Sequence, residues 1–232
     1  RLRGYGTTLV ATLGVFGAIL AYFVAAIFEW RASYFIGGGL GLVLLVLRVR
    51  VFESGIFLKA KTSDVVRGNI LMLFNSRDRF FRYIKCILVG LPIWFVVGVL
   101  FTFSPQLGQA LGLHEAVDAG KAVILSFASQ TFGNITSGLL SQYTQSRKKI
   151  MGLFILLSFG FSLLYLLLPV DSVNVFYFLC ILLGFANGYW TLFITVAAEA
   201  FGTNLRATVA TTVPNFVRGA VIPITMLFLY LE

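Results

Sequence analysis

Arg218 is the one charged residue inside an otherwise uncharged stretch, residues 207–231. A charge within a membrane-spanning helix costs about 2.5–3.5 kcal/mol on insertion scales, so it normally faces a cavity, a partner or a ligand. Asn215 and Thr211 precede Arg218 at helical spacing and share its face. We therefore predict that Arg218 and Asn215 bind an anionic group of a solute. The alternative is a structural pairing of Arg218 with a helix-end carbonyl or with a carboxylate elsewhere.

Two more uncharged stretches carry polar residues on one helix face, and a third contributes a tryptophan. The stripe in 122–146 consists of Ser126, Gln130, Asn134 and Ser137. In 172–198 an amide and hydroxyls lie beside an indole, a combination that suits recognition by hydrogen bonding and stacking. The further predicted solute-binding residues are Gln130, Asn134, Asn187, Trp190, Thr191 and Trp94. Small polar side chains also join helices to one another, which is the alternative.

A third group of residues predicts a gate made of ion pairs. Glu199 is an acidic residue close to a basic cluster, so it needs a partner, and Arg147 and Arg206 are the candidates. Contacts that form in one state of a protein and break in another can act as a gate between the two states. We predict a second pair between Glu53 and Arg3. Ordinary solvated charges at helix ends are the alternative.

Catalytic constellations are not apparent. The only histidine, His114, has Glu115 and Asp118 nearby, which is poor evidence for a metal site. Cys86 and Cys180 lie in or beside apolar runs, so we expect buried thiols rather than a disulfide or a metal pair. We expect no enzyme, no metal and no cofactor.

The elements that position these residues are seven apolar runs. Hydrophobic residues make up 59% of the chain and charged residues only 12%, the composition of a membrane protein. Most runs have the length that crosses a bilayer as a helix. The runs are 4–28, 32–47, 86–113, 122–146, 150–170, 172–198 and 207–231. We predict an all-α integral membrane fold with seven transmembrane helices.

The basic residues predict an orientation. Alternate gaps between the runs collect 15 of the 18 Lys and Arg residues, and the other gaps hold two. The positive-inside rule places the rich side in the cytoplasm, in a plasma or bacterial inner membrane. The net charge of +9 is then a topology signal and an attraction to membrane lipid, and we expect no nucleic-acid partner. A seven-helix receptor, the alternative class, needs the opposite orientation.

Residues 53–82 form the one sizeable polar segment. An apolar stripe interrupts it, and helix starts are predicted at Ser63 and Ser76. We expect amphipathic helices lying along the cytoplasmic interface. The predicted domains are two helices in 1–52, this linker, and a five-helix bundle in 83–232.

Five short motifs resemble the major facilitator superfamily of secondary transporters, in its sugar-porter and organic-ion branch. Four of them match helix starts or inner helix ends of that family. The motifs are Arg3-Gly4, Trp30-Arg31, Phe52-Glu53-Ser54-Gly55 and the Glu199–Arg206 stretch. The fifth, 138–149, resembles the family's loop between helices eight and nine, with Gln142, Tyr143 and Gln145 in place of its Asp, Arg and Gly.

The resemblance implies that the runs are helices 5 to 11 of a twelve-helix fold, with helices 1–4 and 12 outside this sequence. It implies a transporter that moves a sugar, organic acid or similar metabolite by alternating access. A proton or sodium ion is the candidate coupling ion, in symport, and the full-length protein is expected to act as a monomer.

Overall fold

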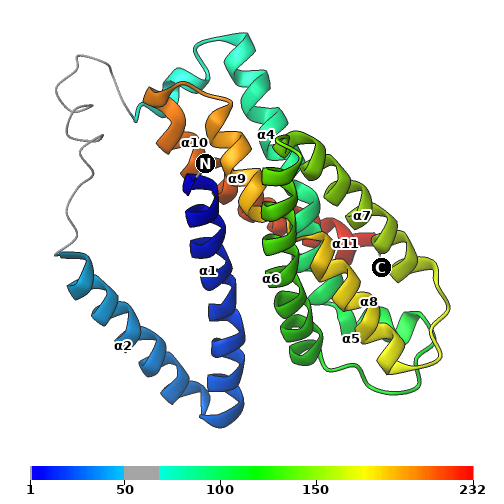
Figure 1. The fold of residues 1–232 in the computed structure, drawn as a ribbon. Helices are drawn as coiled ribbons and strands as arrows, with labels where there is room; N and C mark the ends of the chain where they lie inside the picture. Colours follow the sequence, from blue (N-terminus) through cyan, green and yellow to red (C-terminus); the bar gives the residue numbers. More distant parts are fainter. Residues whose placement is uncertain (1, 50–67, 232) are drawn as a thin grey trace.

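The computed structural model describes residues 2–49 and 68–231, and the regular elements in these residues are all helical (Figure 1). The elements are α1 (Leu2–Ile27), α2 (Trp30–Val49), η1 (Ile70–Leu73), α4 (Arg77–Phe95), η2 (Val96–Phe101), α5 (Ser104–Ala110), α6 (Ala119–Tyr143), α7 (Arg147–Leu167), α8 (Val173–Ala186), α9 (Trp190–Glu199), α10 (Thr203–Gly219) and α11 (Val221–Leu231). The predicted all-α class is confirmed.

Five described segments are long and apolar enough to cross a membrane by length and composition. They are Trp30–Val49, Arg77–Phe101, Arg147–Leu167, Val173–Glu199 and Thr203–Tyr230. α6 has a comparable length but is not among them, and it carries a row of buried serine, threonine and amide side chains. The all-helical membrane class therefore holds, while the count of seven spans stays a prediction.

The helix start predicted at Ser76 is present, because Ser76 is the N-cap of α4. This helix continues without interruption to Phe95, so residues 77–82 are its first turns and not a separate interfacial helix. In these first turns Arg82 pairs with Asp78 one turn earlier and also donates to the carbonyl oxygen of Ala200, just after α9, at 3.1 Å. The linker residues 53–67, with the other predicted helix start, lie outside the described residues.

α6 lies between α1 and α8 (Figure 1). It packs against α8 and α1, while α7 packs on α8 and α4 packs on α10. Gly133 of α6 and Gly188, which follows α8, allow the two backbone segments to touch. A methyl group on either glycine would overlap the backbone around the other one. Two buried apolar clusters fill the bundle, one around Phe176 and one around Phe193.

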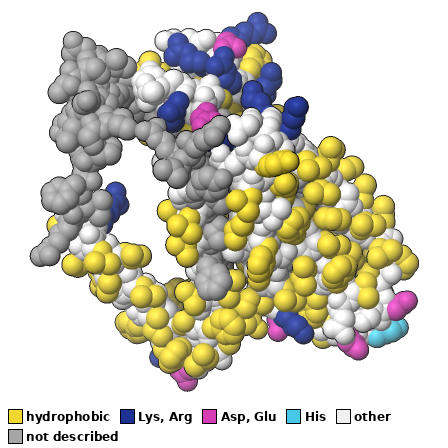
Figure 2. Space-filling model, viewed as in Figure 1, with side chains coloured by type: hydrophobic (Ala, Val, Ile, Leu, Met, Phe, Trp, Pro, Cys, Tyr) yellow, Lys and Arg dark blue, Asp and Glu magenta, His cyan; other side chains and the backbone are white. Residues whose placement is uncertain are grey.

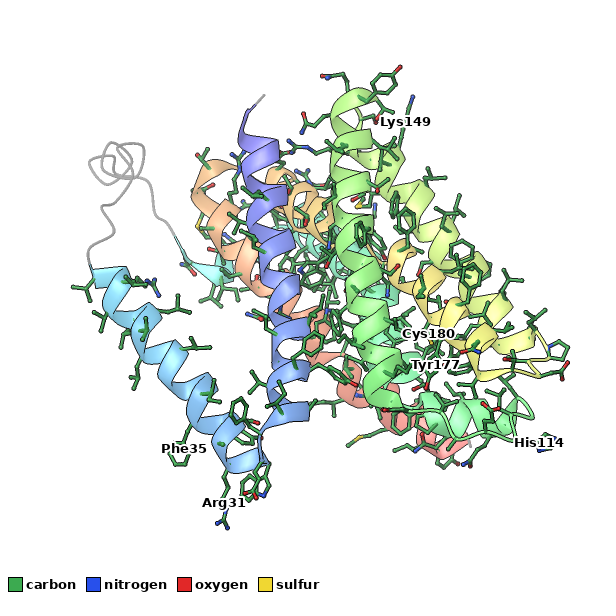
Figure 3. All side chains as sticks on the ribbon, turned by 60° about the horizontal axis from the view of Figure 1, so that its bottom comes forward. Arg31, Phe35, His114, Lys149, Tyr177 and Cys180 are labelled. Atoms are coloured by element: carbon green, nitrogen blue, oxygen red, sulfur yellow. The ribbon has the colours of Figure 1, made fainter. Side chains whose placement is uncertain are left out.

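The helix ends separate the charges. Figure 2 shows most of the described Lys and Arg side chains gathered at one end of the molecule, with apolar side chains along its flank. Lys149 lies at this end, whereas Arg31 and His114 lie at the opposite end (Figure 3). At the second end, Lys121 lies with its Nζ 4.7 Å from the ring centre of Tyr177. The Lys and Arg residues that occupy alternate gaps between the apolar runs therefore form one strongly basic end.

Candidate functional site

Three helices lose their regular geometry close to predicted solute-binding residues. α4 contains Pro92 and continues as the π-helical turn η2 directly after Phe95. The 172–198 run is two helices, α8 and α9, separated at 187–189, and the 207–231 run is α10 and α11, separated at Ala220. Discontinuous helices and π-turns are typical of binding sites inside membrane bundles, because the interrupted backbone exposes polar groups there.

Four of the predicted residues lie close to one another near these interrupted helices. The guanidinium carbon of Arg218 lies 5.6 Å from the ring centre of Trp94 and 5.5 Å from that of Trp190. The two indoles meet edge to face, with ring centres 6.1 Å apart. Arg218 Nη1 donates to Asn215 Oδ1 at 3.5 Å. We call Trp94, Trp190, Asn215 and Arg218 the Trp–Arg cluster.

The chemistry of the Trp–Arg cluster suits an anionic ligand. A guanidinium presents five N–H donors in a planar fork that matches a carboxylate. Two indole faces hold it by cation–π attraction, which leaves donors available at its edges. Trp94 Nε1 is buried and has no hydrogen-bond partner among the described residues, so it adds another donor without an acceptor. Arg218 itself is exposed, which makes its charge accessible.

An apolar cavity of about 580 Å³ adjoins the Trp–Arg cluster between α4 and the α10–α11 junction. It is lined by Ile87, Leu91, Thr212, Asn215, Phe216, Gly219 and Ala220. Asn215 belongs to both the cavity lining and the cluster, so the two are adjacent. Trp94 lies on the same face of α4 as Ile87 and Leu91, by helical spacing. We call this space the α4–α10 cavity.

The other four predicted residues meet in a different place, the seam between α6 and α8–α9. Asn134 Oδ1 accepts from the backbone nitrogen of Thr191 at 3.4 Å and from its hydroxyl at 3.2 Å. Gln130 Nε2 donates to the carbonyl oxygen of Asn187 at 3.4 Å. All four side chains are buried, and none of them is bonded to Arg218 in the described part of the chain. The structure thus places them as contacts between helices.

Sequence reasoning missed two features of this seam. Ser158 of α7 donates to Asn187 Oδ1 at 3.2 Å and so links a third helix. Ser158 is a polar residue in the apolar run 150–170, and this could have predicted a contact with another helix. The amide nitrogens of Asn134 and Asn187 are buried and have no partner among the described residues. Such donors are costly in the interior, so the seam is not a fully satisfied contact.

One of the ion pairs predicted for the gate is present in the structure. Arg147, at the start of α7, pairs with Glu199, at the end of α9, and their side chains are 29% and 51% exposed. A cleft of about 460 Å³ lies beside this pair. Arg206 is exposed near the start of α10, and the described residues give it no ion pair. The Arg3 side chain and all of Glu53 lie outside what the structure describes.

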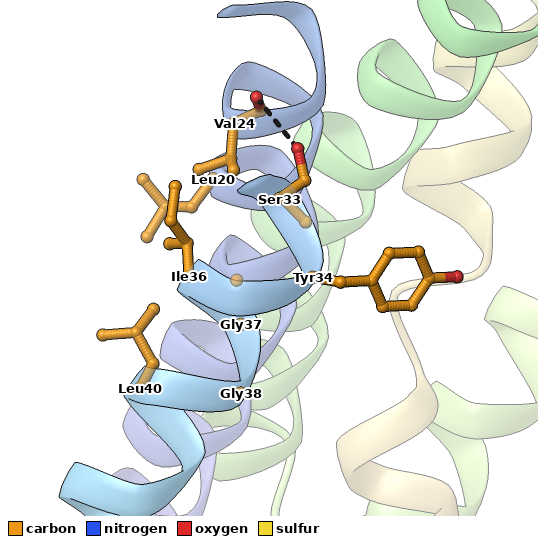
Figure 4. A pocket seen from close by; sticks show the side chains of 10 residues that line it. Leu20, Val24, Ser33, Tyr34, Ile36, Gly37, Gly38 and Leu40 are labelled. Atoms are coloured by element: carbon orange, nitrogen blue, oxygen red, sulfur yellow. Dashed lines mark hydrogen bonds between the residues drawn. The ribbon is translucent and has the colours of Figure 1, made fainter. Parts of the chain in front are cut away.

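A groove of about 460 Å³ between α1 and α2 differs in chemistry (Figure 4). Aliphatic side chains and glycines line most of it, and Ser33 Oγ donates to the carbonyl oxygen of Val24 at 3.5 Å. Among the described lining residues the polar side chains are Ser33 and Tyr34, and none is charged.

Comparisons with known proteins agree with this architecture. Residues 4–224 match the model of the Major Facilitator Superfamily, a span that begins in α1 and ends in α11. The comparisons with curated proteins and with solved structures gave no match. The resemblance to the sugar-porter and organic-ion branch stays a prediction. A match over nearly the whole chain, together with helices that are long and apolar enough to cross a membrane, shows that the protein belongs to the Major Facilitator Superfamily of membrane transporters.

Proposed function

We propose that this membrane transporter moves a small anionic organic solute by alternating access and that the Trp–Arg cluster binds it. The observation that carries the proposal is the accessible guanidinium of Arg218 held against two indole rings, at a place where three helices are interrupted. The uncharged runs from residue 86 onward contain no other charge. An anion is the ligand that satisfies such a site electrostatically.

The Arg147–Glu199 pair supports the alternating-access part of the proposal. It joins the ends of α7 and α9 at the basic end of the bundle. Exposed ion pairs contribute only about 0–1 kcal/mol, so this one can break and re-form as the transporter changes state. We assign Arg206 to the same gate, and Arg3 with Glu53 to its counterpart at the start of the chain.

Gln130, Asn134, Asn187 and Thr191 take a supporting role in this proposal. They hold α9 against α6, and Trp190 is the first residue of α9. Their hydrogen bonds therefore fix the ring that contacts Arg218. If they also line the pathway, they do so in another state of the transporter, in which the unpaired amides of Asn134 and Asn187 gain acceptors.

The proposed setting is a plasma or bacterial inner membrane, with the basic end and residues 53–82 in the cytoplasm. The proposed domains are 1–52, 53–82 and 83–232, and the full-length protein acts as a monomer that contacts lipid and solute. Symport with a proton or sodium ion is the proposed coupling.

Uptake into proteoliposomes by the full-length protein tests the proposal. Radiolabelled benzoate, lactate and glucose are the probes, with Arg218→Gln and Arg218→Lys as variants. A charge-assisted hydrogen bond contributes about 1.5–3 kcal/mol, so Arg218→Gln should reduce uptake of a transported anion by about tenfold or more. Arg218→Lys should lose less. Lys149→Gln, at the basic end, is the control and should leave uptake unchanged.

Three results would contradict the proposal. Anion uptake that persists at the wild-type rate in Arg218→Gln would remove the cluster from solute binding. Uptake of glucose but of neither anion would assign a neutral substrate, and protein that moves none of the probes across a range of proton and sodium gradients would count against transport of this class.

A further inference from the structure

The α4–α10 cavity adds information about the solute that Arg218 alone does not give. We propose that the transported solute is a monocarboxylate with an apolar body, whose carboxylate binds Arg218 and whose body fills the α4–α10 cavity. This inference rests on the proposed anion-binding function and narrows its substrate class.

The charge of the site argues for a single negative charge on the solute. Within the uncharged runs 86–113, 122–146, 150–170, 172–198 and 207–231, Arg218 is the only ionised side chain. One carboxylate is therefore matched by one guanidinium. A second carboxylate or a doubly charged phosphate would bring a charge that no described side chain of these runs neutralises, and an unpaired charge is expensive in a low-dielectric interior.

The walls of the cavity argue for an apolar body. Ile87 and Leu91 of α4 face Phe216 of α10, and Asn215 and Thr212 supply the only polar side chains of the lining. Thr212 is already engaged, because Tyr83 donates its hydroxyl to Thr212 Oγ1 at 2.7 Å. A sugar or a polyol would bury several hydroxyls here without partners, whereas a hydrocarbon group would be favourably removed from water.

The cavity belongs to the solute pathway and not to the lipid surface. Thr211, Asn215 and Arg218 are all exposed and lie on one face of α10. A face that carries a charged and an amide side chain is not directed at hydrocarbon, so it faces an aqueous space. Since Asn215 lines the cavity and bonds to Arg218, the cavity opens on that same space.

A substitution at Gly219 tests whether the apolar body of the solute binds in the α4–α10 cavity. A Cβ at this position meets nothing within 4 Å, so a larger side chain enters the open cavity without a clash. Gly219→Leu should fill part of the cavity and leave Arg218 in place. Gly160 of α7 also has nothing near its Cβ and does not line the cavity, so Gly160→Leu is the matched control.

The measurement is a titration of intrinsic tryptophan fluorescence in the full-length protein. The chain supplies three tryptophans, and Trp30→Phe leaves the two that contact Arg218; any tryptophan outside this sequence is replaced as well. The titrants are phenylacetate, acetate, succinate and benzyl alcohol. We expect phenylacetate to bind at least about tenfold more tightly than the other three, since only phenylacetate has both the single charge and the apolar body.

The two proposals fail in different ways. Gly219→Leu should weaken phenylacetate about tenfold and leave acetate unchanged, whereas Arg218→Gln should weaken both. If Arg218→Gln weakens anion binding but Gly219→Leu does not, or if succinate binds most tightly, the monocarboxylate inference is wrong and the anion site stands. If Arg218→Gln leaves every anion unaffected, the proposed function fails, and the inference that rests on it fails too.

Discussion

The guanidinium of Arg218 gains part of its stabilisation from two indole rings. A cation–π contact contributes about 0.5–1 kcal/mol at an exposed site, so Trp94 and Trp190 together offset roughly half of the 2.5–3.5 kcal/mol that an arginine near the middle of a membrane span costs. Asn215, at 3.5 Å, adds only a weak contact. The remaining deficit is what a bound anion would relieve, which is why this residue is central to the account.

The indoles should therefore matter for affinity and not only for packing. Trp94→Leu and Trp190→Leu should each weaken binding of phenylacetate about two- to fivefold, because each removes one cation–π contact with Arg218. Isothermal titration of the purified variants measures this. Trp30→Leu is the control, since Trp30 contacts Arg31 at the opposite end of the bundle. An unchanged affinity in both site variants would show that the rings do not support the guanidinium.

The Arg147–Glu199 pair should control access to its cleft more than it controls stability. Both side chains are partly exposed, so Glu199→Gln should change the thermal unfolding temperature by no more than about 2 °C. It should speed the modification of Ser146→Cys in the cleft by a charged thiol reagent, because the pair no longer holds α7 and α9 together. Lys148→Gln removes a charge from the same cleft and should not have this effect. Equal rates in the two variants would contradict the gate.

At the scale of elements, runs of apolar residues predicted where helices occur but not where they break. The run 172–198 is apolar nearly throughout, yet it is interrupted at 187–189, where the backbone oxygen of Asn187 accepts from Gln130 of α6 and its side-chain oxygen accepts from Ser158 of α7. Pro92 and Gly219 were local signals for the other interruptions. The sequence did not predict the close approach of α6 and α8, because that approach depends on which glycines of two separate runs face each other.

That close approach gives an element-scale prediction. A methyl group at Gly133 would overlap the backbone oxygen of Phe185, so Gly133→Ala should destabilise the bundle by about 1–3 kcal/mol. Thermal unfolding in detergent measures the loss. Gly160→Ala is the matched control, because a Cβ there meets nothing within 4 Å and alanine favours a helix. A Gly133→Ala protein as stable as the Gly160→Ala protein would mean that α6 and α8 are not packed as described.

At the scale of the whole molecule, composition and charge order predicted the membrane class and the separation of the ends. They did so because the bilayer imposes a length and a charge asymmetry on every helix independently. The Trp–Arg cluster was predicted only as separate residues, since nothing in the sequence states that α4, α9 and α10 meet. The four seam residues were grouped with the cluster because polarity alone does not distinguish a pathway from a helix contact.

The proposed orientation, with the basic end in the cytoplasm, can be measured in intact cells. Cys86 and Cys180 are first replaced by Ala, so that introduced cysteines react alone; any cysteine outside this sequence is replaced in the same way. His114→Cys should then react with an impermeant reagent added outside, while Lys148→Cys should react only after the membrane is permeabilised. His114 and Lys149, the sequence neighbour of Lys148, lie at opposite ends of the bundle (Figure 3), so the pair of cysteine variants is internally controlled. The reverse pattern would invert the proposed topology.

The central claim, that an anion binds at Arg218, is tested most directly by protection of the neighbouring position. Asn215→Cys is made in the protein without native cysteines, and its reaction with an impermeant sulfonated thiol reagent is timed with and without phenylacetate. The account predicts that phenylacetate slows the reaction in a saturable way when Arg218 is present and has no effect in Arg218→Gln. A reaction rate in the Arg218 protein that does not change with phenylacetate, benzoate or lactate would contradict it.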